Sequence, residues 1–188
     1  NNAAAAFYLP FEMTSEKRFR VAYEINVNAP WHLTQRVHPQ MKARGEGWVL
    51  NISSATSVHP EGPPFADFAR TATLYGSTKA ALERMTTGMA AAMHEDGIWV
   101  NSMAPVAAVM TEGAIALGVV PEEAVREAES LEAMAEASLA LCTTRDPQLT
   151  GRITYCTPLL GELERAVRTL DGREELAGPR ADQAPPPS

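Results

Sequence analysis

Long apolar runs and an excess of basic residues are both missing from this 188-residue chain. No apolar run approaches the roughly 20 residues of a membrane-spanning helix, so we expect no membrane partner. Its 16 Lys and Arg stand against 23 Asp and Glu, a net charge of −7. Because phosphate binding needs a basic face, this balance argues against nucleic acid as a partner. We expect an ordinary soluble, cytoplasmic protein.

Cysteine is scarce, and an initiator methionine is missing. Cys142 and Cys156 are the only cysteines, and their spacing matches no metal site. We therefore expect two buried, reduced thiols and no metal, with a structural disulfide as the less favoured alternative. Because the chain begins at Asn1, we also expect it to start in the middle of a larger fold.

Apolar residues make up 45% of the chain, enough for a folded core. Short apolar runs predict buried strands at 48–52, 98–103 and 153–155. Helical patterns cover 14–43 (with an interruption at 26–30), 74–95, 121–141 and 159–170. Strands that alternate with long helices predict an α/β fold, with a Rossmann-like parallel sheet and flanking helices. Three strands are few for such a sheet, so we expect its N-terminal strands to be absent from this chain.

The ends of these elements carry local signals. Thr14 is the expected N-cap of the first helix, and Gly45 and Gly47 are expected to end it. The long loop at 55–72 follows a strand, where loops more often carry function. The tail at 175–188 ends in Ala-Pro-Pro-Pro-Ser, and we expect it to be disordered.

Tyr75 and Lys79 lie four residues apart at the start of a predicted helix, so both side chains share one face. A phenol, with an ordinary pKa of about 10, acts as an acid or base near neutrality only if something stabilises the phenolate. A neighbouring ammonium does this. The alternative for the pair taken alone is an ordinary solvated helix face.

Other polar groups lie at strand ends or at the helix interruption. Ser53 and Ser54 end the first apolar run, where ligands bind in open α/β sheets and where a hydroxyl can polarise a carbonyl. Pro30 has no N–H, so it leaves the Asn26 carbonyl without its helical donor. The alternatives are a plain strand end and a plain proline kink.

Taken in order, these segments resemble the short-chain dehydrogenase/reductase family, as a classical-type member truncated before its fourth strand. The matching segments are residues 1–4, 25–27, 49–54, 75–81, 100–105 and 149–152. The resemblance covers residues 1 to about 160. It implies that residues 1–174 are the C-terminal part of a Rossmann-type domain.

The resemblance implies a role for each motif residue. Tyr75 exchanges the proton at the substrate oxygen, and Lys79 lowers the tyrosine pKa and holds the nicotinamide ribose. Ser54 orients the substrate carbonyl, and Asn26 positions a water that relays protons. The coenzyme is NAD or NADP. Its implied contacts are Asn2, Ala3, Ala4, Tyr75, Lys79, Pro105, Val106, Ala107 and Thr111.

The departures from the family leave two functions open. The glycine-rich nucleotide turn is absent, and Ala4 and Val106 stand where the family has glycine. The first hypothesis is an NAD(P)-dependent oxidoreductase that interconverts an alcohol and a ketone of small size. The alternative is a non-catalytic fragment that cannot bind nucleotide alone and acts through association. The resemblance also implies a homo-oligomer formed through the helices at 26–44 and 74–95.

Overall fold

The computed structural model describes residues 1–106, 108–109, 111 and 129–176. The three strands form one parallel sheet in the order β1-β2-β3, which confirms the predicted α/β fold. In chain order the elements are η1 (Phe11–Met13), α1 (Glu16–Tyr23), η2 (Glu24–Asn28), α2 (Ala29–Arg44), β1 (Gly47–Ile52), η3 (Ala55–Ser57), α3 (Asp67–Thr71), α4 (Thr73–Met93), η4 (His94–Asp96), β2 (Ile98–Ala104), α6 (Leu131–Thr143), β3 (Ile153–Tyr155) and α7 (Cys156–Glu162).

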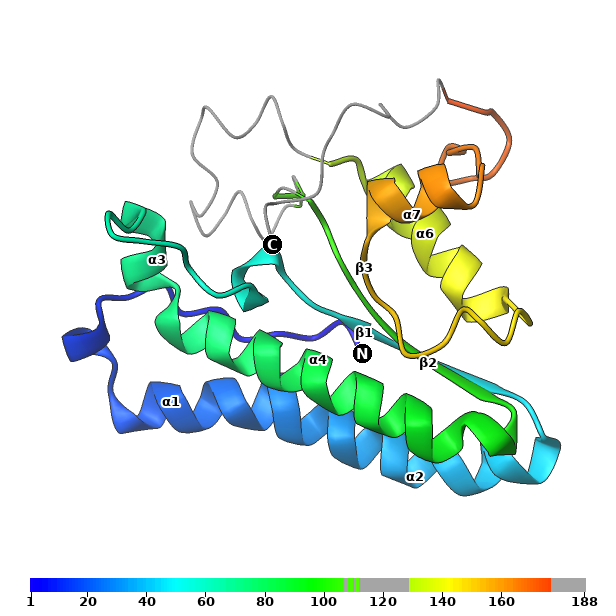
Figure 1. The fold of residues 1–188 in the computed structure, drawn as a ribbon, viewed down its shortest axis with the longest axis horizontal. Helices are drawn as coiled ribbons and strands as arrows, with labels where there is room; N and C mark the ends of the chain where they lie inside the picture. Colours follow the sequence, from blue (N-terminus) through cyan, green and yellow to red (C-terminus); the bar gives the residue numbers. More distant parts are fainter. Residues whose placement is uncertain (107, 110, 112–128, 177–188) are drawn as a thin grey trace.

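The sheet lies between two groups of helices (Figure 1). Helices α1, α2 and α4 cover one face, and α6 and α7 cover the other. The first face buries a cluster that includes Val49, Met89 and Val100. The second buries a cluster that includes Leu141 and Leu159. Both faces of the strands are therefore covered, as the continuous apolar runs predicted.

Among the residues that the structure describes, Asn1 alone pairs with the outer edge of β1. The Asn1 carbonyl accepts a hydrogen bond from the Ile52 N–H (3.0 Å), and the Asn1 amino group donates to the Leu50 carbonyl (2.8 Å). This is the spacing of a parallel ladder. No strand forms over residues 2–10, so the opening segment leaves most of this edge open.

The interruption of the first helical pattern is a π-helical segment, η2. The Ala29 N–H donates to the Glu24 carbonyl, five residues back, and Pro30 has no N–H to offer the Asn26 carbonyl. The expected N-cap at Thr14 is wrong by one residue, because the Ser15 hydroxyl accepts from the Arg18 N–H (3.3 Å).

Helix α2 ends at Gly45, which adopts φ 68°. The expectation that Gly47 also ends this helix is wrong, since Gly47 is the first residue of β1. The predicted helix at 159–170 is also wrong in its bounds, because α7 begins at Cys156 and ends at Glu162. Gly161 weakens the helix, and Glu164 adopts a left-handed φ of 49° that no helix accommodates.

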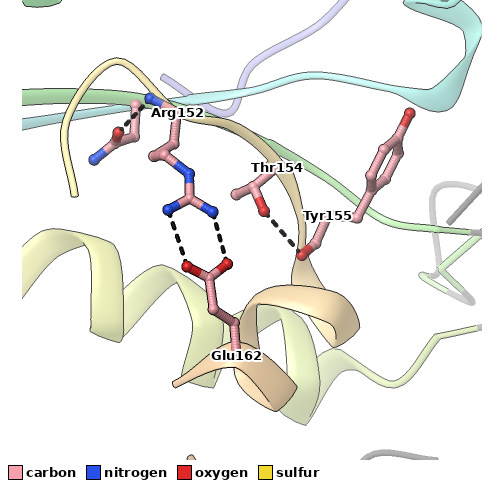
Figure 2. A network of polar contacts seen from close by, with 5 residues as sticks. Arg152, Thr154, Tyr155 and Glu162 are labelled. Atoms are coloured by element: carbon pink, nitrogen blue, oxygen red, sulfur yellow. Dashed lines mark hydrogen bonds and ion pairs between the residues drawn. The ribbon is translucent and has the colours of Figure 1, made fainter. Parts of the chain in front are cut away.

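A forked ion pair fixes α7 beside β3 (Figure 2). Two Arg152 nitrogens donate to the two Glu162 oxygens at 3.0 and 2.6 Å. The Arg152 N–H also donates to the Asn101 side chain (3.0 Å), which ties the start of β3 to β2. Figure 2 shows the Tyr155 ring pointing away from this pair.

Cys142 and Cys156 are both free thiols. Cys156 is buried as predicted, but Cys142, in the last turn of α6, is exposed, so the expectation of two buried thiols is wrong for Cys142. Two methionines of α4 pack against the core, where Met89 is buried and Met93 is half-buried. The predicted helix at 121–128 and the tail at 177–188 lie outside the described residues. None of the described helices combines the length and apolarity needed to cross a bilayer.

Candidate active site

Ser54 and Tyr75 meet where β1 ends beside the first turns of α4. The Ser54 hydroxyl oxygen accepts from the Thr56 N–H (3.2 Å) and the Thr56 hydroxyl (3.0 Å), so its own proton is free to face Tyr75. Burial raises the pKa of Tyr75, and the hydrogen bond with Ser54 opposes this rise. Gly76 permits the close approach, since a Cβ there would collide with the Thr56 carbonyl.

Lys79 lies one helical turn after Tyr75 and is only 2% exposed. Its Nζ donates to the Ile52 carbonyl (2.7 Å) and lies 5.5 Å from the centre of the Tyr75 ring. Burial lowers the pKa of Lys79 to about 8, and the Glu83 carboxylate opposes this fall. The sequence-predicted pair therefore shares one side of α4 at the end of β1.

Asn26 joins three parts of the chain with its side-chain amide. Its oxygen accepts from the Ala5 N–H (2.8 Å), and its nitrogen donates to the Ala5 carbonyl (2.9 Å) and the Thr78 hydroxyl (2.9 Å). Thr78 directly precedes Lys79, so this amide holds the opening segment against the turn of α4 that carries the lysine. The side chain is thus a clamp, while the role implied for Asn26 belongs to its main chain.

Tyr8 adds a second phenol that sequence reasoning missed. Its ring centre lies 5.3 Å from that of Tyr75 and 5.5 Å from that of Phe68. The opening segment reaches this place by running along α4 towards α3 (Figure 1), where the Leu9 N–H donates to the Thr71 carbonyl (3.0 Å). Burial and the neighbouring Tyr75 raise the pKa of Tyr8. The one available signal in the sequence was that Tyr8 is an aromatic residue shortly after the motif at residues 1–4.

Glu83 is a second residue that sequence reasoning missed. One of its carboxylate oxygens accepts from both the Ser53 hydroxyl (2.5 Å) and the Ser57 hydroxyl (2.7 Å). These two serines flank Ser54, and Glu83 itself lies one turn after Lys79. The spacing of four residues from Lys79 was the available signal.

The residues expected to contact the coenzyme follow the strands. Asn2, Ala3 and Ala4 are exposed beyond the residue that pairs with β1. Pro105 and Val106 follow β2 and are half-buried. Ala107 lies outside the described residues, and Thr111 is half-buried with its N–H bonded to the Val109 carbonyl (2.8 Å).

The turn after β2 is anchored by Glu129, another residue that the sequence did not indicate. Its buried carboxylate accepts from the Val106 N–H (2.5 Å), the Thr157 N–H (3.2 Å) and the Thr157 hydroxyl. It thereby links the end of β2 to the first turn of α7. In the part of the chain that the structure describes, no three His, Cys, Asp or Glu side chains gather as metal ligands.

The long loop at 55–72 contains η3 and α3 and lines a cavity of about 600 Å³. The cavity lies against one side of α4, at Thr73, Gly76, Ser77 and Ala80. Tyr75 is not part of this lining. The loop at 55–72 therefore borders an apolar hollow beside the face of α4 that carries Tyr75 and Lys79.

These side chains gather at the carboxyl end of a parallel strand, which is where open α/β sheets bind ligands. A sequence model of the family described as short chain dehydrogenase matches residues 1–117. The chain therefore belongs to the short-chain dehydrogenase/reductase family.

The related proteins are longer than this chain, which aligns with only part of each. The 7alpha-hydroxysteroid dehydrogenase of Escherichia coli (strain K12) is 32% identical over 161 residues, which are 81% of this chain and 59% of the relative. Senescence-associated protein 13 of Arabidopsis thaliana is 29% identical over 105 residues, 56% of this chain and 36% of the relative. A solved 7α-hydroxysteroid dehydrogenase with NADH and 7-oxo glycochenodeoxycholic acid has 29% identity and a TM-score of 0.71, covering 82% and 60% of the two chains. This chain thus spans about three fifths of the hydroxysteroid dehydrogenase.

Proposed function

We propose that this chain carries the catalytic part of an NAD(P)-dependent oxidoreductase that interconverts a small alcohol and ketone, with Tyr75 as acid and base. The observation that carries the proposal is the meeting of Ser54, Tyr75 and Lys79 at the end of β1. Family membership supports it, as does the relative solved with NADH.

In ketone reduction, the Tyr75 hydroxyl donates its proton to the substrate oxygen as negative charge develops there. The Ser54 hydroxyl donates a hydrogen bond to the same oxygen. Burial raises the pKa of Tyr75, so the phenol keeps its proton at neutral pH until substrate binds. The Lys79 ammonium, 5.5 Å from the ring centre, stabilises the phenolate that forms.

The residues present fit one end of the coenzyme. An ammonium and a phenol at an open strand end match the hydroxyls of a nicotinamide ribose, and NAD or NADP would supply or accept the hydride when bound. We assign the ribose to Tyr75 and Lys79. The other proposed contacts are Asn2, Ala3, Ala4, Pro105, Val106, Ala107 and Thr111.

Asn26 has a proposed role through its main chain. Support comes from Pro30, which leaves the Asn26 carbonyl without an i+4 donor, and from the π-helical segment Glu24–Asn28 in which Asn26 lies. We propose that this carbonyl holds a water that passes protons to Lys79.

The proposed homo-oligomer would use the helices at 26–44 and 74–95. Support comes from two exposed apolar side chains on one face of α2, Leu33 and Val37, which lie four residues apart and are 56% and 38% exposed. A soluble monomer rarely leaves several large apolar groups together on one helix.

The test is turnover with NADH and NADPH over a panel of ketones and secondary alcohols. It uses the 188-residue chain and any longer protein in which it occurs. Tyr75→Phe should lose at least roughly 100-fold in kcat, because the proton donor is gone. Tyr155→Phe, which changes a half-buried phenol on β3, is the matched control. Equal turnover in Tyr75→Phe and wild type would overturn the proposal.

A second function is supported by the open edge of β1. Within the described part of the chain only Asn1 pairs with that edge, and the chain spans about three fifths of its hydroxysteroid dehydrogenase relative. The chain alone would then be a non-catalytic fragment that binds no nucleotide and acts through association. Calorimetric titration with NADH and NADPH separates the two functions. Saturable, micromolar binding of either nucleotide to the chain alone would contradict the hypothesis of a non-catalytic fragment. Absence of such binding would favour that hypothesis.

A further inference from the structure

Glu83 binds the strand end on both sides of the catalytic serine. Its Oε1 accepts from the Ser53 and Ser57 hydroxyls at 2.5 and 2.7 Å. Hydrogen bonds to an ionised acceptor are about twice as strong as neutral ones. The backbone adds two further bonds, from the Ser53 N–H to the Met103 carbonyl (2.8 Å) and from the Ser57 N–H to the Ser54 carbonyl (3.0 Å).

Lys79 and Glu83 lie on consecutive turns of α4, and together they bind the end of β1 and the segment that follows it. Lys79 donates to the carbonyl of Ile52, the residue that precedes Ser53. Glu83 then takes the hydroxyls of Ser53 and Ser57. Ser54 lies between the residues that Lys79 and Glu83 hold. Its hydroxyl bonds with neither of these two side chains and instead interacts with Tyr75.

The titratable groups around Lys79 come from several elements. On α4 they are the Tyr75 phenol and the Glu83 carboxylate. The opening segment contributes the Asn1 amino group, which is also positive. From β3, Tyr155 faces Glu83 rather than the lysine. Glu83 is therefore the one negative group that acts on Lys79 among the described residues.

We propose that Glu83 is a positioning residue of this site, which fixes the turn that presents Ser54 and keeps Lys79 in its ammonium form. The proposal rests on the proposed function, because that function gives Ser54 and Lys79 their roles. Only a carboxylate performs both tasks at once, since an amide oxygen could accept the two serine hydrogen bonds but carries no charge to balance the lysine.

The first test measures Lys79 directly and needs no turnover. The chain has only three lysines, Lys17, Lys42 and Lys79, so their side-chain NMR signals are readily assigned in a lysine-labelled sample. In Glu83→Gln we expect the pKa of Lys79 to fall below its value of about 8, and in Glu83→Asp to return towards it. Lys42, which pairs with Asp96 instead, should be unchanged. An unchanged Lys79 pKa in Glu83→Gln would overturn the proposal.

The second test separates the charge from the hydrogen bonds. Glu83→Gln keeps an acceptor for the serines, whereas Glu83→Ala removes both functions. We expect about a tenfold lower kcat for Glu83→Ala at neutral pH, with KM little changed, and a pH profile whose lysine limb shifts to lower pH in Glu83→Gln. Glu95→Gln, on the exposed turn after α4, is the control. A Glu83→Ala variant with wild-type kcat overturns the proposal, whereas a wild type without turnover is a failure of the proposed function alone.

Discussion

Replacing Asn26 by alanine removes the clamp and leaves the main-chain carbonyl in place. The amide is 1% exposed and makes three hydrogen bonds, to the Ala5 N–H, the Ala5 carbonyl and the Thr78 hydroxyl. Each such bond contributes roughly 0.5–1.5 kcal/mol net. Thr78 keeps a partner, because its hydroxyl also donates to the Tyr75 carbonyl (2.7 Å), and water can reach the half-buried Ala5 groups.

The expected loss for Asn26→Ala is therefore about 2–4 kcal/mol of unfolding free energy. Urea denaturation measures it, as a fall in the midpoint with an unchanged m-value. Asn28→Ala is the matched control, because Asn28 is exposed and makes one hydrogen bond, to Glu24 (2.8 Å). It should cost under roughly 0.5 kcal/mol. Equal midpoints for the two variants would refute the clamp.

Two further predictions concern α4. Gly76→Ala should lose roughly 1–3 kcal/mol of stability, because its Cβ collides with the Thr56 carbonyl; Gly88→Ala, where a Cβ meets only the flexible Arg84 side chain, should gain up to about 1 kcal/mol. Thermal unfolding of both variants checks this, and a stable Gly76→Ala would contradict the close packing. Burial lowers the pKa of Lys79 from 10.5 to about 8, so between pH 8 and 10 the folded chain binds fewer protons than the unfolded chain. The unfolding free energy should then rise with pH by roughly 2–3 kcal/mol over that window. Urea midpoints at several pH values test this, and a rise of equal size in Lys79→Met would contradict it.

The strands were predictable because their signals are local. The apolar runs at Trp48, Ile98 and Ile153 each became a strand within a residue of the expected start. The last helix was misplaced because Leu159, Leu160 and Val167 are all buried at helix-like spacing, yet the chain reverses between them. Periodicity reports burial, and burial does not require a continuous helix.

The shared helix face of Tyr75 and Lys79 was predictable for a different reason. Tyr75 and Lys79 are four residues apart, so they share one face of a helix whatever fold surrounds that helix. Tyr8 reaches Tyr75 across 67 residues, and Glu83 reaches Ser53 across 30, so neither contact has a local pattern. Such partners become visible only once the chain has brought its segments together.

The contacts that orient the catalytic groups are all supplied within this chain. Ser54 is fixed by Thr56 and by the two serines that Glu83 holds, while Lys79 is fixed by the Ile52 carbonyl. The Ile52 carbonyl lies on the outer side of β1, because the Ile52 N–H on that side bonds with Asn1, whereas the contacts that fix Ser54 do not involve that edge. Added strands on that edge would extend the sheet on the far side of β1 from β2. The Lys79 titration needs neither turnover nor bound nucleotide, so it can succeed even where NADH binding fails.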